Sequence, residues 1–133
     1  MNKTKKIKSL VNKTIVRSLP SVYHNGVTID IAFSNDGNQM VFSCTLHKEA
    51  SSSYTEILKN SVYFDKDLIR TSVEYKESED AIVVTYHEDL MQLNYARFTY
   101  LLDEFSWVAS KQKETLLRLI GGEELEFVYF ARN

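Results

Sequence analysis

The chain has 133 residues, 44% of them hydrophobic and 26% charged, with four glycines and one proline. This composition excludes a disordered chain, and the length suits one hydrophobic core, so we expect a single domain over residues 1–133. The formal net charge of −2 excludes an extended basic surface for nucleic acid. Apolar runs fall short of the roughly 20 residues that cross a membrane, and no signal-peptide core follows the lysine-rich start. We therefore expect a cytoplasmic protein without a membrane span.

The first predicted element is an amphipathic helix over residues 7–19, where apolar residues recur at three- and four-residue spacing. Pro20 ends it, because proline lacks an N–H and disfavours a helical conformation in the residue before it. Residues 1–6 are expected to be frayed.

The next two elements form a predicted hairpin. After Asn25-Gly26, a turn-forming pair, apolar residues alternate with polar ones from Val27 to Phe33 and again from Met40 to Leu46. The segment between them contains Asp36-Gly37, which supplies the positive φ that a hairpin turn needs. Cys44, the only cysteine, lies on the apolar side of the second strand. It is predicted to be a small buried side chain, and no intrachain disulfide is possible.

A short helix and a second hairpin follow. Residues 51–53 are serines that can cap a helix from Tyr54 to Val62, because a serine oxygen accepts a bond from a free N–H of the first turn. Residues 69–75 and 81–87 are predicted strands, joined by the charged turn 76–80.

The last element is a helix about 40 Å long that starts near the cap residue Asn94 and ends at Gly121-Gly122. Asp103 and Glu104 interrupt its apolar stripe and are predicted to lie on the solvated face. Residues 121–133 form a tail, and its apolar part, Leu125 to Phe130, is predicted to be an extra edge strand.

The order of elements predicts an α+β fold: helix, antiparallel hairpin, short helix, antiparallel hairpin and a long C-terminal helix packed on a twisted antiparallel sheet. Strands joined by tight turns must run antiparallel, and helices bury their apolar stripes on such a sheet.

Motifs of catalysis or metal binding are lacking in the sequence. His24, His47 and His87 have no second ligand at helical i, i+4 spacing, and four glycines are few for a phosphate-binding loop. We expect a non-enzymatic protein with no catalytic, cofactor-binding or metal-binding residues and no cofactor. The aromatic surplus fits protein binding instead, and Tyr54, Tyr63, Tyr75 and Tyr86 are equally compatible with a contact surface and with core.

The order of elements resembles the class I chaperones of bacterial type III secretion systems. The segment Glu56 to Phe64 is similar to the family's short helix, which ends in a Leu-x-x-Asn-x-x-aromatic pattern. The acidic turn 76–80, the strand around Ile82-Val83-Val84 and the long helix with Phe98, Leu102 and Phe105 continue the likeness. The tail Leu125 to Phe130 has no match in that pattern.

The resemblance implies a cytoplasmic homodimer that holds the N-terminal segment of a secreted effector in an extended, secretion-competent form. For the dimer interface it implies the short helix, with Tyr54, Ile57, Leu58 and Val62. For the effector-binding groove or its supporting core the candidates are Ile29, Ile31, Phe33, Met40 and Phe42. An alternative of another class is an immunity protein or dedicated inhibitor that binds a folded toxin, whose association would be steered by charge and weakened by salt.

Overall fold

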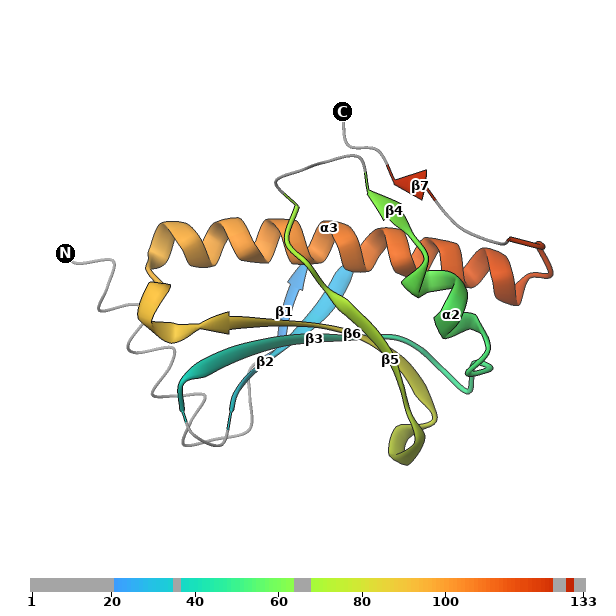
Figure 1. Cartoon of the computed structure of the whole chain (residues 1–133), viewed down its shortest axis with the longest axis horizontal. Coiled ribbons are helices and arrows are strands. Elements are labelled where there is room, and N and C mark those ends of the chain that lie inside the picture. The colour runs from blue at the N-terminus through green and yellow to red at the C-terminus, as the bar shows by residue number, and fades with distance from the viewer. Residues whose placement is uncertain (1–20, 35–36, 64–67, 126–128, 131–133) are drawn as a thin grey trace.

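The structure is a computed structural model that describes residues 21–34, 37–63, 68–125 and 129–130. The predicted helix over residues 7–19 and the turn residue Asp36 lie outside the described residues. An antiparallel five-stranded sheet has the order β1-β2-β3-β6-β5, and the long helix α3 crosses one of its faces (Figure 1). The predicted α+β class is confirmed. The strands of this sheet are β1 (Ser21–His24), β2 (Val27–Phe33), β3 (Gln39–Lys48), β5 (Ser72–Lys76) and β6 (Ala81–Asp89).

The predicted first hairpin is confirmed as β2 and β3, and a further strand, β1, precedes it. β1 turns into β2 through Asn25 (φ 50°) and Gly26 (φ 82°), the pair of positive φ angles that a two-residue hairpin loop requires. The turn was predicted, but β1 was not, because four residues give too little alternation to stand out.

The predicted second hairpin is confirmed as β5 and β6. β5 begins at Ser72, three residues later than predicted, and Asp80 closes the turn with a φ of 47°. A one-turn helix, η1 (Glu77–Glu79), lies inside that turn. β6 lies between β3 and β5, and its residues from Ala81 to Thr85 are all buried, so both of its faces are covered there.

The short helix α2 spans Tyr54–Lys59 and is shorter than predicted. Asn60 ends it, and Ser61 bonds back to the carbonyl of Leu58 through both its N–H (3.2 Å) and its hydroxyl (2.6 Å). Val62 therefore belongs to the next strand, β4 (Val62–Tyr63), and not to the helix. The predicted serine cap was also wrong, since the Ser53 side chain caps no N–H of α2.

The long helix α3 spans Tyr95–Ile120. It follows the single turn η2 (Leu90–Gln92) and begins as predicted, because the Asn94 side chain accepts a bond from the N–H of Arg97 at 2.7 Å. Asp103 is exposed, but the prediction for Glu104 was wrong: Glu104 is 8% exposed. Its position in line with buried Val108 and Thr115 places it on a second buried stripe of α3.

The core lies between the sheet and α3, and α2 contributes to it. Alternation along the strands points one face toward α3, whose apolar stripe covers it. Its largest buried apolar side chains are Ile29, Ile31, Met40, Phe42, Leu58, Ile82, Val84, Leu101, Phe105 and Leu116.

A second, smaller sheet is separate from the first. β7 (Tyr129–Phe130) pairs in parallel with β4, in the register Val62↔Tyr129 and Tyr63↔Phe130. In Figure 1 this ladder is drawn on the opposite side of α3 from the five-stranded sheet. The extra strand predicted in the tail therefore pairs with β4 and not with the main sheet. Within the described ranges, neither α2 nor α3 has the length and apolarity to cross a membrane.

Candidate protein-binding site

Four of the five predicted groove residues lie in the core. Ile29, Ile31 and Phe42 are fully buried and Met40 is 2% exposed. The Phe42 ring packs edge-on against the rings of Phe98 and Phe105, with ring centroids 6.0 Å and 5.5 Å apart, so α3 covers this face of the sheet. Of the two roles predicted for them, groove contact or supporting core, the burial of these four fits supporting core.

Phe33 is the one predicted groove residue that reaches the surface. It is half-buried at the end of β2 and packs against the core. Its position leaves part of the ring available beside the β2–β3 turn. Of the five predicted residues, Phe33 alone is therefore placed to contact a partner directly.

The backbone edge of β1 is a second candidate surface. Among the described strands β1 pairs only with β2, so its other edge carries N–H and C=O groups that no described strand covers. Val22 packs on the core, whereas Tyr23 is 74% exposed. A hollow of about 390 Å³ extends from Tyr23 of β1 across β2 and β3 to Lys113 of α3, and Gly26, Val27, Thr28, Asp30, Cys44 and Thr45 complete its lining.

Side chains of the β1–β2 turn fasten this edge to α3. His24 Nε2 lies 2.6 Å from Asp103 Oδ1, and the Asn25 amide donates to the Ser106 hydroxyl at 2.8 Å. The Ser106 hydroxyl donates to the Asp103 carbonyl at 3.0 Å. Since Ser106 bonds to Asn25 and not to His24, these residues do not form a nucleophile–base pair. They position β1 on the helix.

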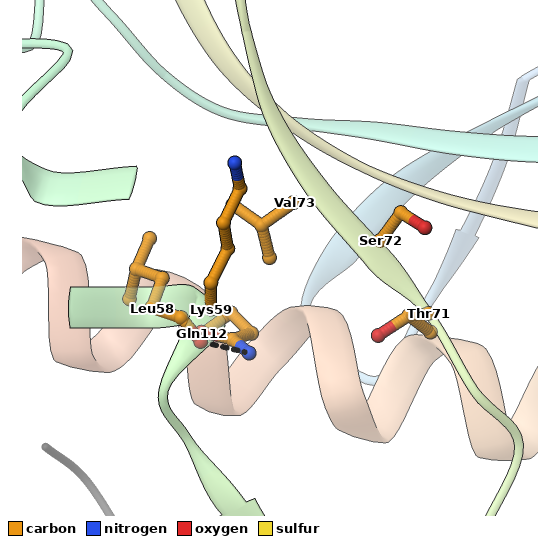
Figure 2. A pocket seen from close by; sticks show the side chains of 6 residues that line it. All are labelled: Leu58, Lys59, Thr71, Ser72, Val73 and Gln112. Carbon is orange, nitrogen blue, oxygen red and sulfur yellow. Dashed lines mark hydrogen bonds between the residues drawn. The ribbon is translucent and has the colours of Figure 1, made fainter. Parts of the chain in front are cut away.

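A hollow lies between α2, β5 and α3, and one predicted dimer-interface residue, Leu58, lines it. Its volume is about 280 Å³, and Leu58, Lys59, Thr71, Ser72, Val73 and Gln112 line it. Figure 2 shows α2 on one side of it, the strand residues on the other, and Gln112, which donates to the Leu58 carbonyl at 3.4 Å. The hollow lies at β5, the other edge strand of the main sheet.

Of the predicted interface side chains, Tyr54 and Ile57 are half-buried and Leu58 is 1% exposed. Leu58 thus packs inside the protein and holds α2 in place, while Ile57 keeps part of its side chain exposed. Val62 follows in β4. Tyr75 and Tyr86 are also half-buried and pack against the core.

A charged cluster that the sequence did not indicate joins β6 to the start of α3. Arg97 Nε donates to Glu88 Oε2 at 2.8 Å, and the Tyr86 hydroxyl donates to Glu88 Oε1 at 2.6 Å. Burial and the bond to Glu88 raise the pKa of Tyr86 to about 12. Burial alone would raise the pKa of Glu88, but the bonds from Arg97 and Tyr86 outweigh it and lower that pKa. The sequence held one clue to this cluster. Alternate side chains of a strand share a face, so Glu88 lies on the same face as Val84 and Tyr86.

Nucleophilic chemistry is not favoured at the cysteine. Cys44 is 2% exposed, and burial raises the pKa of its thiol to about 11, so the thiolate is disfavoured at neutral pH. The prediction of a small buried side chain is confirmed. No group of three metal-ligating side chains comes together within the described ranges.

No protein-family model and no curated protein sequence matches the chain. Among solved structures, a chain from the ExoT-SpcS complex of Pseudomonas aeruginosa is similar, with a TM-score of 0.56 and 14% identical residues. The match covers 84% of this chain and 98% of that chain. SpcS is a type III secretion effector chaperone. The resemblance drawn from the sequence is thereby confirmed at the level of the fold.

Proposed function

We propose that this protein is a cytoplasmic, non-enzymatic chaperone that binds a secreted effector and keeps the effector's N-terminal segment extended and competent for secretion. The observation that carries the proposal is the likeness to the ExoT-SpcS structure, since the match spans nearly the whole of that neighbouring chain. Fold does not fix function, so the surfaces of this chain must also suit the task.

The edge of β1 suits the binding of an extended segment. A partner strand can add to its free backbone groups, and Tyr23 and Phe33 offer aromatic surface near that edge. Ile29 and Ile31, buried beneath, keep the strands rigid, so little order is lost when the partner binds. Main-chain bonds would supply affinity, and the Tyr23 and Phe33 rings would select side chains.

A homodimer through α2 is the second part of the proposal. Ile57 is half-buried on α2 and adjacent in sequence to Leu58, which lines the hollow at the edge strand β5. A second subunit that covered both would bury the Ile57 side chain and protect the edge from other strands.

The test of effector binding is capture from the native lysate with the tagged full-length protein, followed by mass spectrometry. We expect a secreted protein whose N-terminal segment alone binds in a purified assay. Tyr23→Asp should weaken that binding, whereas Met91→Asp, at a residue 94% exposed on η2, should not. Recovery of a folded toxin domain would instead support an immunity protein.

The test of the dimer is light scattering during size exclusion at micromolar concentration. We expect wild type to be a dimer and Ile57→Asp to be a folded monomer, because the new carboxylate would be buried without a partner. Leu117→Asp, at a residue 48% exposed on α3, is the control and should remain dimeric. A monomeric wild type, or a dimeric Ile57→Asp variant with an unchanged circular dichroism spectrum, would remove this part of the proposal.

A further inference from the structure

We infer that the edge of β4 is a separate strand-accepting site for an extended, aromatic-rich segment, and that the chain's own β7 occupies it when no partner is bound. β7 pairs with β4 in parallel through two residues on each strand. The chain thus provides both an acceptor edge and an occupant from its own C-terminal end.

Local hydrogen bonds and a glycine form a defined turn at the end of α3, before the tail. At the end of α3 the N–H of Gly122 bonds to the Leu119 carbonyl and that of Glu123 to the Arg118 carbonyl, both at 3.1 Å. Gly122 has a φ of 99°, which a glycine adopts without strain. These bonds form a Schellman turn. The Arg118 guanidinium also lies 2.7 Å from the Glu123 carboxylate in an exposed ion pair.

The acceptor is fixed more firmly than its occupant. β4 directly follows α2, and the two bonds from Ser61 to the Leu58 carbonyl tie the start of β4 to a helix anchored in the core. Within the described residues, β7 is held by a ladder of two residues. Isolated two-stranded ladders are marginally stable, and parallel strands normally have neighbours on both sides. An incoming strand that pairs with the same two residues of β4 and packs more side-chain surface than β7 could therefore displace it.

The tail itself indicates the chemistry of the ligand. Residues 125–130 read Leu-Glu-Phe-Val-Tyr-Phe, with three aromatic residues and one charge. A competing segment must run parallel to β4 and be extended and rich in aromatic residues. That an effector supplies this segment rests on the proposed function; the exchange at β4 does not.

The experiment uses the full-length chain and a fluorescein-labelled peptide of residues 123–133. Tyr129→Pro removes a backbone N–H from β7, and Tyr129→Phe is the matched control that keeps it. In a third variant, Val62→Cys with Tyr129→Cys, an oxidised disulfide locks the tail onto β4. The strand spacing of about 4.8 Å is compatible with the Cα separation of a disulfide, and Cys44 is buried and does not compete.

We expect Tyr129→Pro to bind the peptide about tenfold more tightly than wild type, because the tethered competitor is gone. Tyr129→Phe should match wild type. The locked protein should not bind, and reduction should restore its binding. Three results would each overturn the inference. They are equal affinities in all variants, no peptide binding by folded Tyr129→Pro, and a double-cysteine protein that forms no disulfide or only links two chains. Because the probe comes from this chain, such a failure would leave the capture of an effector untouched, and a failed capture would leave the exchange at β4 untouched.

Discussion

Two regions of the molecule differ in the length of their helices and strands. The sheet–helix body, made of β1, β2, β3, β5, β6 and α3, contains strands of up to 10 residues and a helix of 26. The outer layer, made of α2, β4 and β7, has elements of six, two and two residues. Leu58 and the Gln112 bond to its carbonyl attach this layer to the body. The body holds most of the core, whereas the outer layer depends on a few contacts for its position.

The largest effect is expected from a substitution that creates a cavity in the sheet–helix body. Phe105→Ala should cost about 3–5 kcal/mol of unfolding free energy, because the fully buried ring contacts Phe42 and leaves a void that close packing cannot fill. Leu117→Ala, on the exposed side of the same helix, should cost less than about 0.5 kcal/mol. Urea denaturation followed by circular dichroism measures both, and similar costs would contradict the packing described.

The attachment of the outer layer can be tested on neighbouring residues of α2. Leu58→Ala should cost about 2–4 kcal/mol, because the side chain is 1% exposed in the core. Ile57→Ala should cost about 1 kcal/mol or less when measured on the separated subunit, since Ile57 is only half-buried there. Thermal and urea unfolding report both values. Equal costs would mean that α2 is not anchored through Leu58 alone.

The sequence determined the body well because its elements are long and periodic. The alternation from Val27 to Phe33 and the stripe through Leu101, Phe105 and Leu116 are repeated often enough to define a strand and a helix. Gly121-Gly122 and Asn94 marked the ends of α3 correctly, because their roles follow from backbone geometry and local bonds.

The outer layer and the site were harder to predict. A two-residue strand such as β4 has no period, so Val62 was assigned to the helix before it. Alternation identified Ile29 and Phe42 as one apolar face, but it could not show that α3 covers that face. The Glu88–Arg97 pair joins elements through side chains and depends on the fold being already formed.

Loss of the charged cluster should weaken the joint between β6 and α3. Glu88→Gln should cost about 2 kcal/mol, less than a fully buried pair, because the Arg97 side chain is 37% exposed. The pKa of Glu88 is lowered in the fold, so its contribution is present above the ordinary value of 4.5 and is lost as the pH falls below that value. The stability gap between wild type and variant in urea should therefore be full at pH 7 and shrink below about pH 4. A gap that is independent of pH would argue against the ion pair.

As a control, Glu114→Gln removes an exposed carboxylate at 3.5 Å from Lys111 and should change stability by less than about 0.5 kcal/mol.

The smallest effect is expected at Gly122, where the tail leaves α3. Gly122→Ala should cost about 1 kcal/mol, because a φ of 99° is strained for any residue with a Cβ, although no neighbouring atom would touch that Cβ. Gly122→Asn should cost less, since asparagine tolerates positive φ better. The strain acts where the tail leaves α3, so hydrogen exchange at the amides of Tyr129 and Phe130 should quicken, while exchange in β6 should change far less. If exchange quickened equally in both places, the tail would unfold together with the body, and the outer layer would not be a separate unit of stability.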